Sequence, residues 1–180
     1  MITGLSRASV ALLLVAIMMP AHIALGAPSA QLPSCVVGDW RLDNPEATFR
    51  SLFASAGGIQ LDGVSGDVVL SIRGDGSYEI NYAQFTLDSS TSAGTSSFTL
   101  DGWIRGSFSE VQPGALVGST TDSSVTMTST VLGRSTTSEA LSVDKEEGAP
   151  VDYDCGLGRL TFTFRTPGSG TDFSFSFIRA

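Results

Sequence analysis

Two aspartates, Asp152 and Asp154, are the residues whose types and spacing come nearest to catalytic chemistry. A pair of carboxylates can hydrolyse a glycoside when one serves as acid and the other as base or nucleophile. They alternate with Tyr153 and Cys155, so in a strand they share the face opposite to the apolar one. A carboxylate that stays in water lacks the raised pKa that a general acid needs. We therefore name no catalytic residue and expect a protein that is not an enzyme.

The first 26 residues have the composition of a signal peptide. Arg7 precedes an apolar run over residues 8–19, and Ala24 and Gly26 place small residues just before a cut. The run is too short to span a bilayer, which takes roughly 20 residues. Removing residues 1–26 also removes His22, the only histidine, and with it any histidine-based acid, nucleophile pair or metal ligand. We expect export to the medium or the cell envelope, with residues 27–34 as a flexible arm.

The charge balance is acidic, with 18 Asp and Glu against 10 Lys and Arg and a net charge of −8. Such a chain is poorly suited to nucleic acid or to anionic membrane surfaces. Beyond the leader no apolar stretch reaches spanning length, so we expect no transmembrane helix. Asp62, Asp67 and Asp75 lack the spacing of a calcium loop. We predict no metal, no cofactor and no nucleic-acid partner.

Cys35 and Cys155 are the only cysteines of the chain. Export permits a disulfide between them, and closing a loop of about 120 residues would stabilise the fold by roughly 4–5 kcal/mol in the chain-entropy model. Leu32-Pro33-Ser34-Cys35 also loosely matches a bacterial lipobox. Lipidation of Cys35 therefore stays open as an alternative, although it would leave Cys155 alone.

The periodicity of the chain changes once, near residue 60. Residues 35–43 form a first strand, and Asp43-Asn44-Pro45-Glu46 then has the pattern of a helix start, with Asp43 or Asn44 as the cap. Phe49, Leu52 and Phe53 give this helix one apolar stripe, and Gly57-Gly58 ends it. From there on apolar residues recur at every second position with turn residues between the runs, which is typical of antiparallel strands.

About eight such strands can be counted, which fits a closed barrel or a two-sheet sandwich. Arg73-Gly74-Asp75 spells an integrin-binding tripeptide, but Gly-Asp is also what a hairpin turn favours, and we interpret it as a turn. Residues 87–97 and 119–140 are rich in Ser and Thr. We interpret them as a loop and a solvated strand face, with O-linked sugars as the alternative.

Gly38-Asp39-Trp40 in the first strand and Arg179 in the last resemble the calycin superfamily of lipocalins, fatty-acid-binding proteins and avidins. The motifs Cys35-Val36-Val37 and Tyr153-x-Cys155 resemble those of small secreted lipocalin-like proteins of actinobacteria. The resemblance implies that Trp40 closes one end of a barrel and that Arg179 packs across its ring, a contact worth roughly 0.5–2 kcal/mol. The expected fold is all-β: an eight-stranded antiparallel up-and-down, calycin-like barrel over residues 35–180, with one short helix after the first strand.

An eight-stranded barrel either fills with side chains or holds one small ligand. We expect a non-enzymatic binding protein with a small apolar ligand inside the barrel. The alternative is a secreted or cell-envelope interaction protein with a packed core. Gly102 and Gly106 lie on the apolar face of a long strand, where they mark either a corner or empty wall beside a ligand. The residues predicted to line the pocket are Leu70, Ile72, Tyr78, Ile80, Tyr82, Leu100, Gly102, Ile104, Gly106, Phe108, Met127, Phe162, Phe164, Phe173 and Phe175.

Overall fold

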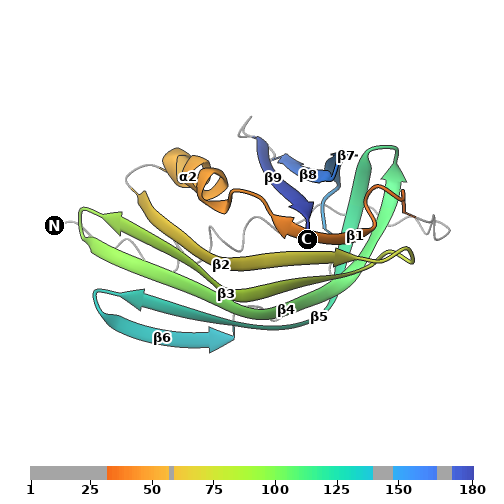
Figure 1. Ribbon diagram of the computed structural model, residues 1–180. Helices are drawn as coiled ribbons and strands as arrows, with labels where there is room; N and C mark the ends of the chain where they lie inside the picture. The colour runs from red at the N-terminus through yellow and green to blue at the C-terminus, as the bar shows by residue number, and fades with distance from the viewer. Residues whose placement is uncertain (1–31, 57–58, 140–147, 166–171) are drawn as a thin grey trace.

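The computed structural model describes residues 32–56, 59–139, 148–165 and 172–180, and the predicted signal peptide lies outside them. Of the predicted arm, Leu32 is described and is buried in the core. The described elements are β1 (Gly38–Leu42), α2 (Pro45–Ala56), β2 (Gln60–Ile72), β3 (Ser77–Thr91), β4 (Gly94–Gln112), β5 (Ala115–Val131), β6 (Arg134–Glu139), β7 (Val151–Gly156), β8 (Arg159–Arg165) and β9 (Asp172–Arg179) (Figure 1).

Eight of these strands close an antiparallel up-and-down barrel. Neighbours in the chain pair from β1 to β5, β5 pairs with β7, and β8 and β9 lead back to β1. The seam between β5 and β7 is the shortest, with Ala115 opposite Asp152 and Leu116 opposite Val151. A hydrogen bond of 2.8 Å from the Tyr153 amide to the Gly114 carbonyl continues it. The predicted fold, an eight-stranded barrel with one short helix after the first strand, is confirmed.

Strands β2 to β5 continue past the barrel as a curved sheet, to which β6 adds one edge strand (Figure 1). For residues 119–140 the sequence predicted a solvated strand face, and the structure has two strands there, β5 and β6. For residues 87–97 it predicted a loop, which is wrong. The structure instead has the end of β3, a turn at Ser92 and Ala93, and the start of β4. These strands carry hydroxyls on the outer face, so the alternation is weak. Hydrogen bonds between hydroxyls of neighbouring strands, such as that of 3.1 Å between Thr128 and Thr137, accompany the strand pairing instead.

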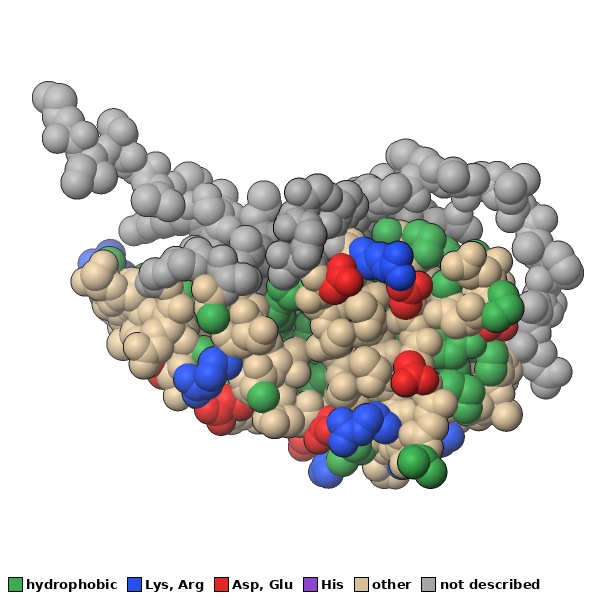
Figure 2. Space-filling view, turned by 90° about the horizontal axis from the view of Figure 1, so that it is seen from above, with side chains coloured by type: hydrophobic (Ala, Val, Ile, Leu, Met, Phe, Trp, Pro, Cys, Tyr) green, Lys and Arg blue, Asp and Glu red, His purple; other side chains and the backbone are tan. Residues whose placement is uncertain are grey.

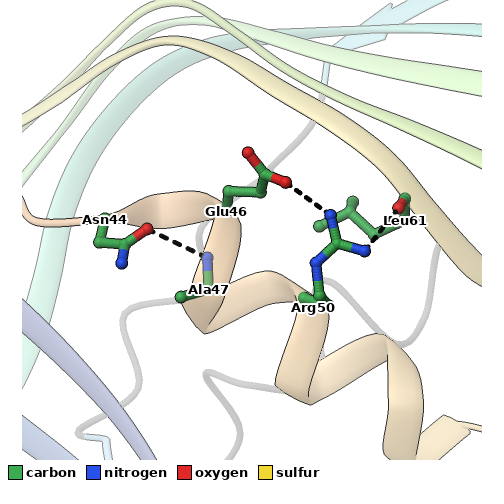
Figure 3. Close-up of polar contacts among 5 residues, drawn as sticks. All are labelled: Asn44, Glu46, Ala47, Arg50 and Leu61. Atoms are coloured by element: carbon green, nitrogen blue, oxygen red, sulfur yellow. Dashed lines mark hydrogen bonds and ion pairs between the residues drawn. The ribbon is translucent and has the colours of Figure 1, made fainter.

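Helix α2 begins as the sequence predicts. The side-chain oxygen of Asn44 accepts a hydrogen bond of 3.3 Å from the Ala47 amide, an N-cap, with Pro45 as first helical residue (Figure 3). Arg50 forms an ion pair with Glu46 at 2.5 Å and donates to the Leu61 carbonyl at 3.4 Å (Figure 3). The helix is therefore tied to the start of β2.

The buried face of α2 is aromatic. Phe49 is 7% exposed, and its ring centroid lies 5.5 Å from that of Phe85 and 6.0 Å from that of Phe175. Phe85 belongs to β3 and Phe175 to β9, so one helical side chain bridges two sides of the barrel. In Figure 1 the helix accordingly covers the concave face of the long sheet beside β9.

Two bulges lie side by side on β2 and β3, between Ser65 and Asp67 and between Tyr82 and Phe85. Strict alternation after Tyr82 would turn Phe85 outward, because a shift of one residue exchanges the faces of a strand. The bulge keeps Phe85 inside the barrel, where it is 3% exposed. It therefore lets Tyr82 and Phe85 both face the interior, three positions apart.

Candidate functional site

One end of the barrel, which we call the closed end, is sealed by Trp40. Its side chain is 1% exposed, and its indole nitrogen donates a hydrogen bond of 2.7 Å to the Val36 carbonyl. The Arg179 guanidinium lies 4.0 Å from the centre of the indole and donates to the Val37 carbonyl at 2.9 Å. The contact of Arg179 across the ring of Trp40, which the resemblance implied, is thus present in the structure.

A disulfide joins Cys35 to Cys155 and ties the segment before β1 to β7. The predicted bridge is confirmed. Because β1 and β7 belong to different parts of the barrel wall, the bond holds the closed end together independently of the β5–β7 seam.

An aromatic column fills the barrel between its closed end and its centre. The rings of Tyr78 and Phe108 stack with centroids 4.4 Å apart, and Phe108, Phe162 and Phe177 follow at 6.0 Å each. Of the predicted lining residues, the buried ones are Leu70, Ile72, Tyr78, Ile104, Gly106 and Phe162. They form the packed part of the interior.

The two interior glycines mark tight contacts. A Cβ on Gly102, which has a φ of +124°, would lie 1.9 Å from the Ser124 carbonyl oxygen of the neighbouring strand. A Cβ on Gly106 would lie 2.0 Å from the Ser119 carbonyl oxygen and 2.7 Å from the Tyr78 ring. Both positions therefore need glycine for close approach, and the Tyr78 ring already fills the space beside Gly106.

The remaining predicted lining residues are partly exposed. Among them Phe175 contacts Phe49 of α2, and Tyr82 and Leu100 flank the bulge beside Phe85, the other ring that contacts Phe49. We call this side of the barrel the helix end. Those in contact with the core cluster are Ile80, Tyr82, Leu100, Phe108, Phe164 and Phe175, whereas Met127 and Phe173 are partly buried outside it. Only Phe108 belongs to the packed column. The partly exposed positions at the helix end lie beside buried residues of the same wall, Val68 and Phe85, so the interior is accessible there only in part.

A cleft of about 240 Å³ opens at the base of α2, where β1 leaves β2; we call it the helix cleft. Its floor is apolar and its rim is polar. It is lined by Arg41, Leu42, Asp43, Asn44, Pro45, Gly66, Asp67, Val68, Phe85 and Ile178. A second hollow of about 270 Å³ lies on the other side of α2, lined by Thr48, Ser51, Leu52, Asp172, Phe173 and Ser174.

The backbone beside the helix cleft is unusual. Four described residues other than glycine have positive φ, and two of them, Leu132 and Leu157, precede glycine in two-residue hairpin turns that require it. The other two are Asn44 (φ 43°), which lines the cleft, and Gln84 (φ 51°), in the β3 bulge beside it. Positive φ at such residues costs free energy and concentrates at binding sites. The cleft was not predicted from the sequence. The one signal for it was the spacing of three between the aromatic residues Tyr82 and Phe85, which breaks the alternation of the strand.

The three tyrosines of the chain all face the interior, and burial raises the pKa of each. Tyr78 bonds to the Thr120 hydroxyl at 3.1 Å, and Tyr153 donates to the Glu110 carboxylate at 2.6 Å. For Tyr82 burial, with the nearby Tyr78 as a lesser cause, raises the pKa to about 12. Tyr82 is therefore the least easily ionised of the three.

The polar candidates of the sequence analysis lie outside the barrel. Asp152 pairs with Arg165 at 2.5 Å, Asp154 is exposed, and Asp75 accepts from Ser77 within its turn. On the face seen from above, Figure 2 shows charged side chains in small groups of mixed sign rather than in one patch. Within the described ranges no three His, Cys, Asp or Glu residues gather as metal ligands, and no helix is both long and apolar enough to cross a bilayer.

Comparisons with known proteins give no relative for this chain: no family model, no curated protein and no solved structure matches it.

Proposed function

We propose that this protein is an exported, non-enzymatic binding protein that holds a small apolar ligand at the helix end of its barrel. The observation that supports this most directly is the contrast between the two ends. Trp40, Ile72 and Leu160 are at most 1% exposed at the closed end, whereas Tyr82, Leu100 and Phe175 are partly exposed at the helix end. Apolar surface that folding leaves accessible inside a concave site gains free energy when a ligand covers it.

The position of the helix cleft also favours a ligand at the helix end. Leu42, Val68 and Phe85 give it an apolar floor that is continuous with the barrel interior. At about 240 Å³ the cleft is smaller than the roughly 300–1,000 Å³ of most ligand pockets, so it suits only a small ligand. Export is part of the proposal and is supported by the composition of residues 1–26 and by the disulfide.

The aromatic column favours the second candidate, an interaction protein with a packed barrel. Tyr78, Phe108, Phe162 and Phe177 occupy the centre, so any ligand would be confined to the helix end. The two candidates differ in one measurable way, since only the first predicts a saturable small-molecule site.

A thermal-shift panel of lipid fragments, isoprenoids and small aromatics tests the proposal. A ligand that binds only the folded state raises the free energy of unfolding by about 2.7 kcal/mol at a hundredfold excess over Kd. At least one compound should stabilise the protein saturably, and native mass spectrometry of protein from its own host should find a bound small molecule. No stabiliser and no bound molecule would favour the packed interaction protein.

Two tryptophan substitutions on β4 locate the site. Leu100→Trp adds bulk to a partly exposed inward position at the helix end and should abolish the stabilisation. Val111→Trp adds the same bulk at a residue that is 55% exposed at the other end of the strand, and should leave it unchanged. If Leu100→Trp does not fold, Leu100→Phe makes the same comparison. Equal stabilisation of both variants would place the ligand elsewhere.

A further inference from the structure

We infer that the ligand is uncharged and that it accepts a hydrogen bond from the hydroxyl of Tyr82. This inference rests on the proposed function and names the chemical class of ligand that the helix end takes.

The first argument is that Tyr82 differs from the other two tyrosines. Tyr78 and Tyr153 face the same interior, and each has a hydrogen-bond partner in the fold. No described residue forms a hydrogen bond with the Tyr82 hydroxyl, although burial raises its pKa to about 12. A hydroxyl that is largely removed from water and has no protein partner costs free energy. A ligand atom that accepts its proton would recover that cost.

The second argument is that this hydroxyl can be reached. Within the described residues, no fully buried side-chain nitrogen or oxygen lacks a hydrogen-bond partner. Since the Tyr82 hydroxyl has none, it is not fully buried, which agrees with the partial exposure of the residue. Its environment is therefore poor in water and yet accessible.

The third argument is the position of Tyr82 in the sheet. Its cross-strand neighbours on the inner face are Val68 and Gly102. Gly102 has no side chain, and Val68 lines the helix cleft. The ring therefore stands between a position without a side chain and the floor of the cleft, at the edge of the β3 bulge.

The fourth argument is charge. On the inward positions of the eight described barrel strands the register places two charged residues, Arg179 and Glu110. Both are engaged elsewhere: Arg179 over Trp40, and Glu110 with the Tyr153 hydroxyl and the Gly114 amide. Neither is left to neutralise a carboxylate inside the barrel, and burying an unpaired carboxylate is very costly. At the rim of the helix cleft Arg41 is outnumbered by Asp43 and Asp67, so the charge of the rim also disfavours an anion. A neutral carbonyl, ester or ether oxygen carries no such cost.

Three probes of similar shape test the inference: acetophenone, ethylbenzene and benzoate, titrated into the folded, disulfide-bonded protein by calorimetry or NMR. Acetophenone and ethylbenzene differ in one carbonyl oxygen, and benzoate adds the charge. We expect acetophenone to bind about three- to tenfold more tightly than ethylbenzene, the range that one net hydrogen bond gives. Benzoate should bind most weakly.

Tyr82→Phe should bring the affinity for acetophenone down to that for ethylbenzene. Tyr78→Phe is the matched control: it also removes an interior hydroxyl, but one already bonded to Thr120, so the preference for the ketone should persist. Tightest binding by benzoate, or an unchanged ketone preference in Tyr82→Phe, would overturn the inference and leave the proposed function standing. Absence of binding by all three probes overturns the inference as well. The wider panel then decides the proposed function separately.

Discussion

The guanidinium of Arg179 occupies the place where a side chain on Gly38 would lie. A Cβ on Gly38 would come within 1.6 Å of the Arg179 Nη1 atom, and the φ of +145° disfavours any other residue. From this position the guanidinium reaches both the Trp40 ring and the Val37 carbonyl. Gly38, Trp40 and Arg179 therefore form one unit: glycine provides the space, arginine fills it, and tryptophan is the surface on which arginine rests.

The first prediction is that Gly38→Ala and Arg179→Ala are not additive. Gly38→Ala should cost about 2–3 kcal/mol, from positive-φ strain and displacement of the guanidinium. Arg179→Ala should cost about 1–2 kcal/mol, from the lost stacking and hydrogen bond. In the double variant the methyl group meets no guanidinium, so the total should fall at least about 0.5 kcal/mol short of the sum. Urea unfolding of the four proteins measures this, and strict additivity would contradict the unit.

The second prediction compares the two tryptophans of the chain. Trp40→Ala should cost about 3–5 kcal/mol, as for other large buried aromatic side chains, because Trp40 is 1% exposed and bonded to Val36. Trp103 is partly exposed on the outer face, with the Arg105 guanidinium 4.1 Å from its ring, and Trp103→Ala should cost about 1 kcal/mol. Thermal and urea unfolding compare the pair. A melting temperature of Trp40→Ala close to that of wild type would refute its role in closing the barrel.

The third prediction concerns the disulfide. Thiol titration of the denatured, unreduced protein should find no free sulfhydryl, because Cys35 and Cys155 are bridged. Reduction should lower the free energy of unfolding by up to about 4–5 kcal/mol, since the bond closes a loop between residues 120 positions apart. Two free thiols, or a lipid mass on a peptide that begins at Cys35, would instead support the lipobox alternative.

The sequence predicted the closed end of the barrel better than the helix end. Trp40, Arg179 and the cysteines have types that few positions accept, and Phe162 and Phe164 alternate cleanly, so local pattern was enough to place them. The helix end depends on the paired bulges at Gly66 and Gln84, which shift the register without a strong composition signal. Strand β6 depends on backbone pairing between polar strands, for which hydrophobic periodicity carries no information. The polar rim at Asn44 and Asp67 arises only when β1, α2 and β2 are brought together.

The fourth prediction uses the tyrosines as reporters of pH. The unfolded state loses tyrosine protons near pH 10, whereas folded Tyr82 keeps its proton to about pH 12. As the pH rises above 10 the unfolded state is therefore favoured, so the contribution of Tyr82 to stability is complete below pH 10 and declines between pH 10 and 12. The decline is less than about 2.7 kcal/mol, because part of Tyr82 remains accessible to water. Burial also raises the pKa of Tyr78 and Tyr153, so tyrosinate absorbance of the native protein should lag behind that of the denatured protein throughout this range.

The free energy of unfolding of wild type minus that of Tyr82→Phe, measured from pH 8 to pH 12, isolates the contribution of Tyr82. It should stay level to about pH 10 and then fall, and a level difference over the whole range would show that the Tyr82 hydroxyl is solvated like that of the unfolded chain.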